Sequence, residues 1–225
     1  MIGRFITLEG IDGCGKSTQL AMLADALRAR GNQIIVTREP GGTRIGEGIR
    51  DLLSSNATEA IQPATELLMI VAARAQHVAE VIRPAIGAGK IVISDRYTDS
   101  SIAFQGYGRG LDLAMIDSVN RFATGGLTPD LTILFDLDAN EAQARLLARR
   151  DGAPRGAPKP ALAYLDELEL EFHKRVRQGY LEIVAADPNR VRVVDASGSA
   201  DSTHAEVMSL VLPLTQSSDL GPDYA

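Results

Sequence analysis

The sequence has one cysteine, Cys14, no tryptophan, and only five Phe and five Tyr among its 225 residues. A single cysteine cannot form an internal disulfide, which fits a reducing compartment. So few aromatic residues argue against a base-stacking platform for single-stranded nucleic acid. No apolar run approaches the length of a membrane span. The composition therefore predicts a protein that contacts no membrane and reads no nucleic-acid strand.

Positive charge is also scarce. Lys and Arg total 23 against 29 Asp and Glu, which gives a net charge of −6. A nucleic-acid surface needs a basic field, so we expect any anionic ligand to be a nucleotide bound by local arginines. Residues 1–4 lead directly into an apolar run, which leaves no room for a signal peptide and predicts a cytoplasmic protein.

What the chain does contain is a phosphate-binding pattern, Gly-x-x-x-x-Gly-Lys-Ser/Thr, at residues 10–17. The apolar run 5–8 before it predicts a strand, and the helical spacing of Leu20, Leu23 and Leu27 after it predicts a helix. Such a loop directs backbone N–H groups and a helix N-terminus at phosphate. We expect ATP at Gly10, Ile11, Asp12, Gly13, Cys14, Gly15, Lys16, Ser17 and Thr18.

Four further apolar runs, at 34–37, 91–94, 131–135 and 191–194, alternate with helical patterns. Strands that alternate with helices predict an α/β fold, a parallel five-stranded sheet of the P-loop NTPase type with helices on both faces. We expect one domain over 1–214, a Gly/Pro-rich flap (LID) at about 149–163, and a disordered tail at 215–225.

Polar residues follow the third run, where Asp95 and Arg96 end a buried strand. Ser17 and Asp95 are candidate ligands for Mg²⁺, and Arg96 is a candidate for a phosphoryl oxygen. The alternative is an ordinary surface ion pair at a strand end. Arg74 lies in an apolar helical stretch and needs an anionic partner, unless it faces solvent.

Phosphoryl transfer needs aligned oxygens within a shell of cations, and no nucleophilic side chain. Candidate catalytic residues are Lys16, Asp95, Arg96, Arg149, Arg150 and Arg155. For any one of the arginines at 145, 149, 150 and 155, a solvated helix face is an equally good interpretation.

Two other classes fit poorly. A GTP-binding switch would carry an Asn-Lys-x-Asp motif, and the sequence has none. A dinucleotide-dependent oxidoreductase would need Gly-x-Gly-x-x-Gly, whereas the glycines here fall at 10, 13 and 15 and precede Lys16.

Several separated motifs together resemble bacterial thymidylate kinase. They are Thr-Arg-Glu-Pro-Gly-Gly-Thr at 37–43, Arg-Ala-Gln-His at 74–77, Ser-Asp-Arg-Tyr-Thr-Asp-Ser-Ser at 94–101, Phe-Gln-Gly at 104–106 and Phe-His-Lys-Arg-Val-Arg at 172–177. The resemblance covers about residues 5–195. It implies transfer of the γ-phosphate of ATP to dTMP, with Mg²⁺, by a homodimer built on helices that include residues 67–86.

The resemblance also assigns the dTMP site. Glu39, Pro40 and Arg50 would border the monophosphate, and Arg74 and Arg96 would hold it. Ser100, Ser101 and Gln105 would address the thymine, Asp12 the sugar 3′-hydroxyl, and Phe104 would disfavour a 2′-hydroxyl. Another nucleoside monophosphate or deoxynucleoside kinase on the same fold remains the alternative.

The chain departs from the family pattern at four places. Ile70 replaces the phenylalanine that usually stacks on thymine, and Ala73 replaces an aspartate. Residues 163–164 lack the usual Asp-Arg pair of the flap, and the phosphate loop has no arginine. The transition-state arginine is therefore expected from the flap, with Arg149, Arg150 and Arg155 as candidates.

Overall fold

A five-stranded parallel sheet forms the centre of the fold, which we take from a computed structural model that describes residues 3–54, 61–151 and 170–215. Its strand order is β2-β3-β1-β4-β5, and every neighbouring pair is parallel. The strands are β1 (Arg4–Glu9), β2 (Ile34–Arg38), β3 (Ile91–Asp95), β4 (Leu131–Asp136) and β5 (Val191–Asp195). All five predicted strands and the predicted α/β class are confirmed.

Burial follows the position of each strand in the sheet. The three central strands β1, β3 and β4 are almost continuously buried, because helices cover both of their faces. The edge strand β5 has only Val191 and Val194 buried, and its other three residues are exposed. The carboxyl ends of the strands therefore meet at one edge of a rigid sheet, where ligands of such folds collect.

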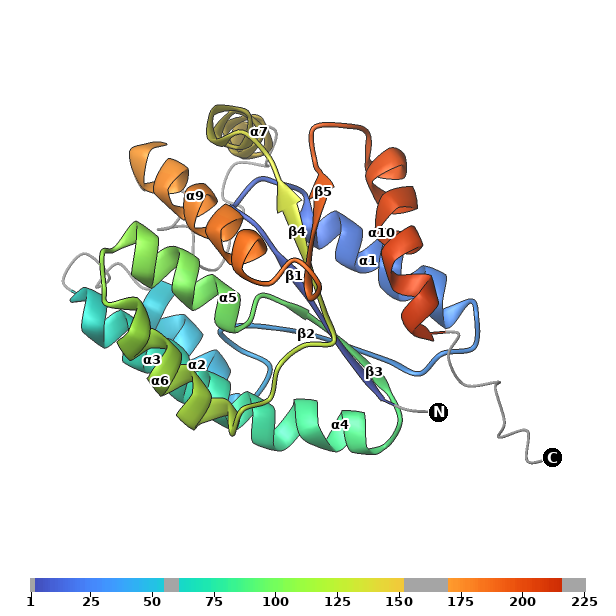
Figure 1. Ribbon diagram of the computed structural model, residues 1–225, viewed down its shortest axis with the longest axis horizontal. Helices are drawn as coiled ribbons and strands as arrows, with labels where there is room; N and C mark the ends of the chain where they lie inside the picture. Colours follow the sequence, from blue (N-terminus) through green and yellow to red (C-terminus); the bar gives the residue numbers. More distant parts are fainter. Residues whose placement is uncertain (1–2, 55–60, 152–169, 216–225) are drawn as a thin grey trace.

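Helices cover both faces of the sheet (Figure 1). Helices α1 and α10 pack together on one side, and α4 and α9 lie on the other, with α3 and α6 packed against each other beyond them. The α-helices are α1 (Lys16–Arg28), α2 (Arg44–Ser54), α3 (Pro63–His77), α4 (Arg83–Gly87), α5 (Thr98–Ser101), α6 (Leu113–Thr124), α7 (Ala139–Asp151), α9 (Leu170–Ala186) and α10 (Ala200–Thr215).

Two segments form π-helices, which the sequence did not predict. The long helix predicted through residues 67–82 begins at Pro63 and contains a π-helical segment at Val78–Ile82. Glycines at 106, 108 and 110 are typical of a turn, but Gly106 and Gly108 lie inside a second π-helical segment, Ile102–Gly108. A Cβ atom on Gly108 would lie 2.7 Å from the Phe172 ring, so this glycine serves close packing against α9 instead of a turn.

Helices α2 and α10 have no counterpart in the sequence interpretation. Thr43 starts α2 by accepting the Gly46 N–H at 3.0 Å, and Ser199 starts α10 by accepting the Ser202 N–H at 3.1 Å. At the start of α7 the Asp138 carboxylate accepts the Asn140 N–H at 2.9 Å. Residues 152–169, which precede α9, and the tail after 215 lie outside the described residues.

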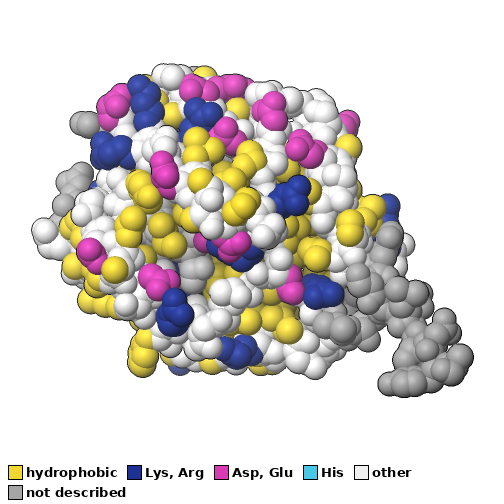
Figure 2. All heavy atoms as spheres, in the orientation of Figure 1, with side chains coloured by type: hydrophobic (Ala, Val, Ile, Leu, Met, Phe, Trp, Pro, Cys, Tyr) yellow, Lys and Arg dark blue, Asp and Glu magenta, His cyan; other side chains and the backbone are white. Residues whose placement is uncertain are grey.

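The face drawn in Figure 2 carries charged side chains of both signs, interspersed with hydrophobic ones. This face therefore carries no uniform basic field. In the part of the chain that the structure describes, no helix is both long and apolar enough to cross a membrane.

Candidate active site

The phosphate-binding loop joins β1 to α1, as predicted. Gly15 precedes the helix with φ +96°, and Gly10 has φ +139° with its missing Cβ 2.6 Å from the Phe135 carbonyl oxygen. The first turn of α1 has no acidic residue, and no side chain caps it. Its N–H groups and the helix dipole are therefore directed at the space above the loop, which suits an anion.

Lys16 is buried and lies back along the loop, where its Nζ donates to the carbonyls of Gly10 at 2.9 Å and Ile11 at 3.1 Å. Cys14 is buried beneath the loop, and burial raises the pKa of its thiol. Cys14 therefore fills space in a tight loop.

An open cleft with about 1140 Å³ of empty space lies over this loop. It is lined by Asp12, Gly13, Gly15, Lys16, Ser17, Thr18, Arg38, Glu39, Arg50, Asp95, Arg96, Arg145, Leu146 and Arg149. Most of the predicted ATP-binding residues thus meet at one cleft, which we call the donor cleft. Gly10, Ile11 and Cys14 are buried behind it.

Helix α7 brings two arginines to the donor cleft, and in Figure 1 it lies beyond the carboxyl ends of β4 and β5. Arg145 donates to the Glu141 carboxylate at 2.6 Å and to the Ala196 carbonyl at 2.9 Å, so it is tied to the scaffold. Arg149 also lines the cleft. The side chain of Arg150, and all of Arg155, lie outside the described residues.

Asp95 and Ser17 both line the donor cleft. The buried Oδ1 of Asp95 has no hydrogen-bond partner among the described residues, and the Ser17 side chain is exposed. No cluster of three or more His, Cys, Asp or Glu occurs in the described ranges. Mg²⁺ is commonly held by one or two protein oxygens together with waters and substrate phosphates, so this donor set fits that ion.

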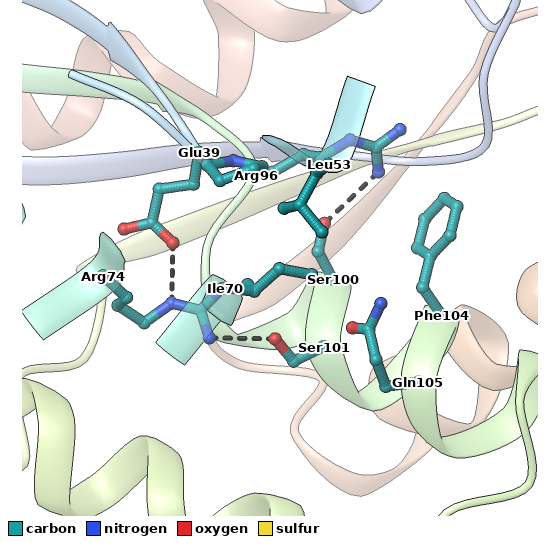
Figure 3. Close-up of a pocket in the computed structure, with 10 residues that line it drawn as sticks. Glu39, Leu53, Ile70, Arg74, Arg96, Ser100, Ser101, Phe104 and Gln105 are labelled. Atoms are coloured by element: carbon teal, nitrogen blue, oxygen red, sulfur yellow. Dashed lines mark hydrogen bonds and ion pairs between the residues drawn. The ribbon is translucent and has the colours of Figure 1, made fainter. Parts of the chain in front are cut away.

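A second cavity of about 400 Å³ adjoins the donor cleft, and we call it the acceptor pocket (Figure 3). It is lined by Glu39, Pro40, Leu53, Ile70, Arg74, Arg96, Ser100, Ser101, Phe104 and Gln105. Nine of these ten were predicted from the sequence as dTMP-site residues, and Leu53 was missed because α2 was missed. Arg50 lines the donor cleft and donates to the Pro40 carbonyl at 2.8 Å.

The two cavities share Glu39 and Arg96. Arg96 donates to the Asp12 carboxylate at 2.8 Å and to the Ser100 hydroxyl at 3.2 Å, and its guanidinium lies 4.6 Å from the centre of the Phe104 ring. Burial alone would raise the pKa of Asp12, but the cationic Arg96 and Lys16 hold it below its usual value. A group shared by both cavities can contact phosphates in each.

Arg74 is fully buried, and its partner is Glu39. Its Nε donates to Glu39 at 2.6 Å, Nη1 to Ser101 at 2.9 Å and also to Asn120, and Nη2 to the Tyr97 carbonyl at 2.8 Å. The charge predicted to need an anion thus has one within the protein. His77, to which no catalytic role was assigned, is buried against the same Glu39 at 2.9 Å.

Sequence reasoning missed two buried groups beneath the acceptor pocket, Glu9 and Tyr180. Glu9 accepts the Tyr97 N–H at 2.7 Å, the Ser100 hydroxyl at 2.6 Å and the Tyr180 hydroxyl at 2.8 Å. Burial, with Asp99 nearby, raises the pKa of Glu9 to about 7, although Arg96, Ser100 and Tyr180 oppose the rise. The available signal for Glu9 was a charged residue at the end of an apolar strand. Tyr180 gave no such signal, because it follows the apolar spacing of a helix and was interpreted as a core residue.

The raised pKa of Glu9 predicts a pH-dependent stability. Its usual value is 4.5, so between that pH and about 7 the folded state binds the proton more tightly than the unfolded state. Stability from this group is present at low pH and is lost as pH rises through 7, on the order of 3 kcal/mol. Glu9→Gln should flatten the slope of unfolding free energy between pH 4.5 and 7, measured with urea. An equal slope in the variant would contradict the prediction.

Comparison with known proteins gives a consistent result. A family model described as "Thymidylate kinase" matches residues 8–207. The thymidylate kinase of Pelotomaculum thermopropionicum is 46% identical over 208 residues, which is 92% of each chain, and that of Deinococcus radiodurans is 47% identical over 209 residues, 93% of this chain and 96% of its own.

A solved structure of a thymidylate kinase is similar to this chain in both fold and sequence. The crystal structure of thymidylate kinase from Ehrlichia chaffeensis has a TM-score of 0.75 and 33% identity, covering 93% of this chain and 98% of that one. The family match spans both cavities and the strands that support them. The chain therefore belongs to the thymidylate kinase family.

Proposed function

We propose that this enzyme transfers the γ-phosphate of ATP to dTMP, giving dTDP for dTTP synthesis. The observation that carries the proposal is the pair of adjoining cavities that share Arg96, one at the phosphate-binding loop and one lined by nine of the residues predicted for the dTMP site. Two anions bound in these cavities would meet at Arg96. That arrangement suits transfer between nucleotides and not hydrolysis by water.

The donor cleft would hold ATP. The loop N–H groups would bind its phosphates, with Lys16 moving from the loop carbonyls to the outer phosphates. Ser17 and Asp95 would hold Mg²⁺, directly or through water, and that ion would neutralise the phosphate charge. Arg149 lines the cleft and is our candidate for transition-state charge, while Arg150 and Arg155 stay predictions from the sequence.

The acceptor pocket would hold dTMP. Arg96 lies where its phosphate would approach the donor, so an oxygen of dTMP can form the new P–O bond as the bond to ADP breaks in line. Arg74 is engaged by Glu39, Ser101, Asn120 and Tyr97, so it would act mainly by holding the pocket wall and Glu39 in place. Asp12, in contact with Arg96, is placed for the sugar.

The base would lie between apolar and polar walls. Leu53, Ile70 and Phe104 supply apolar surface, and Ser101 and Gln105 supply polar groups. Ile70 cannot provide the aromatic stacking that a phenylalanine would give. In proteins that bind single-stranded nucleic acids, such stacking contributes about 1–3 kcal/mol per base. This difference does not favour another nucleoside monophosphate kinase, given the family match.

Residues 1–214 are proposed as one domain with a flap at about 149–163, most of which lies outside the described residues. We also propose a homodimer and a cytoplasmic location with no nucleic-acid polymer as partner. The exposed Leu68 on α3 and Phe122 on α6 support a dimer through these packed helices, which the particle mass from light scattering tests. The lone buried thiol of Cys14 suits a reducing compartment.

An ADP-release assay with ATP, Mg²⁺ and a panel of dTMP, dUMP, dCMP and AMP tests the function. We expect the highest kcat/KM with dTMP, and loss of activity in excess EDTA that Mg²⁺ restores. A preference for AMP or dCMP would refute the assignment of the acceptor. Full activity in EDTA would refute the role given to Ser17 and Asp95.

A further inference from the structure

The side chain of Gln105 is anchored from outside the acceptor pocket. Its Nε2 donates to Oε1 of Glu66 at 2.7 Å, and the other oxygen of Glu66 accepts from Arg109 at 2.9 Å. Gln105 and Glu66 are both buried, each 3% exposed. Glu66 lies in the first turn of α3, and Arg109 follows the π-helical segment that carries Gln105. The first turn of α3 and the residue that follows the π-helical segment thus fix one carboxamide.

The chemistry of Glu66 decides which way that carboxamide faces. The two ends of a glutamine amide have nearly the same shape, but one donates hydrogen bonds and the other accepts them. A carboxylate paired with Arg109 accepts only, so the nitrogen of Gln105 must face Glu66. The oxygen is then the end left for the pocket, and Figure 3 shows it on the side of Ser101.

The other polar groups of the pocket are already engaged. The Ser101 hydroxyl accepts from Arg74 at 2.9 Å, and the Ser100 hydroxyl donates to Glu9 at 2.6 Å. The Oε1 of Gln105, by contrast, accepts no hydrogen bond from the described residues. An acceptor that is fixed in direction and has no partner at the wall of the acceptor pocket is suited to a donor on the ligand.

We propose that Glu66, held by Arg109, fixes the Gln105 amide as an acceptor and thereby makes the pocket select a base with a ring N–H over one with a ring lone pair. The inference rests on the proposed function. Thymine and uracil carry an N–H at N3, whereas cytosine has a lone pair there, which would face the Gln105 oxygen. Glu66 and Arg109 are positioning residues, because they act through Gln105 and do not line the pocket.

The variant Glu66→Gln removes the acceptor-only constraint and keeps the size of the side chain. A glutamine at 66 presents either a donor or an acceptor, so Gln105 can face either way and can donate to cytosine N3. We expect the ratio of kcat/KM for dTMP to that for dCMP to fall roughly 10-fold or more, within the range of base discrimination by one amide. The dTMP to dUMP ratio should stay constant, because both bases carry the N3–H.

Two further variants make the test specific. Glu182→Gln makes the same chemical change at an exposed position of α9 and should leave both ratios unchanged. Arg109→Gln leaves Glu66 without its cation and should lower the ratio of kcat/KM for dTMP to that for dCMP by a smaller factor than Glu66→Gln does. This variant provides the test if Glu66→Gln folds poorly.

The outcomes separate the two proposals. Suppose that the wild-type enzyme prefers dTMP, but that Glu66→Gln and Arg109→Gln each lose activity equally on dTMP, dUMP and dCMP. Glu66 is then only structural and the inference is wrong. A wild-type enzyme with no preference for dTMP would overturn the proposed function as well. A selective gain of dCMP use relative to dTMP supports the inference.

Discussion

Lys16→Met is expected to lower kcat by roughly 100-fold or more while the protein stays folded. Methionine keeps the length and apolar stem of the side chain but removes the ammonium from a cleft built for phosphates. In the structure that ammonium donates to two loop carbonyls, so its loss also leaves Gly10 and Ile11 without these bonds. The cost in stability should be about 1–2 kcal/mol, too small to unfold the chain.

Single-turnover phosphoryl transfer, with thermal unfolding measured in parallel, checks this prediction. Lys90→Met is the matched control, because Lys90 precedes β3 at the edge of the sheet opposite the phosphate-binding loop. The control should retain full turnover. Wild-type turnover in Lys16→Met would mean that the loop does not serve the transferred phosphate, and the donor cleft would have to be reassigned.

The positions of the strands were predictable because a strand that is buried on both faces of a parallel sheet has a nearly continuous apolar sequence. Runs such as 91–94 and 131–135 are nearly all apolar, and all five became strands. Helix α2 was missed although Ile45, Ile49, Leu52 and Leu53 follow helical spacing, because Gly46 and Gly48 are poor helix formers. Missing α2 also removed Leu53 from the predicted pocket.

Residues of the site were predictable as types and positions, but their partners were not. Arg74 plainly needed an anion, yet the anion is Glu39, which lies 35 residues away at the end of β2. Tyr180 follows the apolar stripe of α9, and nothing in that spacing shows that its hydroxyl reaches Glu9, 171 residues earlier. Such pairings depend on strand order, which periodicity does not encode.

Arg96→Lys is expected to lower kcat/KM for dTMP by roughly 100- to 1,000-fold, although the positive charge remains. Lysine cannot reproduce the guanidinium fork, which here reaches Asp12, Gly10, Ser100 and Tyr180 at once. Arg96 also has φ +74°, a left-handed conformation uncommon outside glycine. A residue held there by so many contacts is positioned within narrow limits.

The acid side of the pH–rate profile separates a functional role of Arg96 from a merely structural one. Arg96 holds the pKa of Asp12 below its usual value, so weakening their contact should raise that pKa and move the loss of activity at low pH upward. Arg121→Lys, in an exposed ion pair with Asp117, is the matched control and should change neither rate nor profile.

If Arg96→Lys lowers the unfolding temperature but leaves dTMP kinetics and the pH profile unchanged, Arg96 only stabilises the phosphate-binding loop. Catalysis would then need another cation between the two cavities, and Arg149 would be the first to test, because it lines the donor cleft from α7.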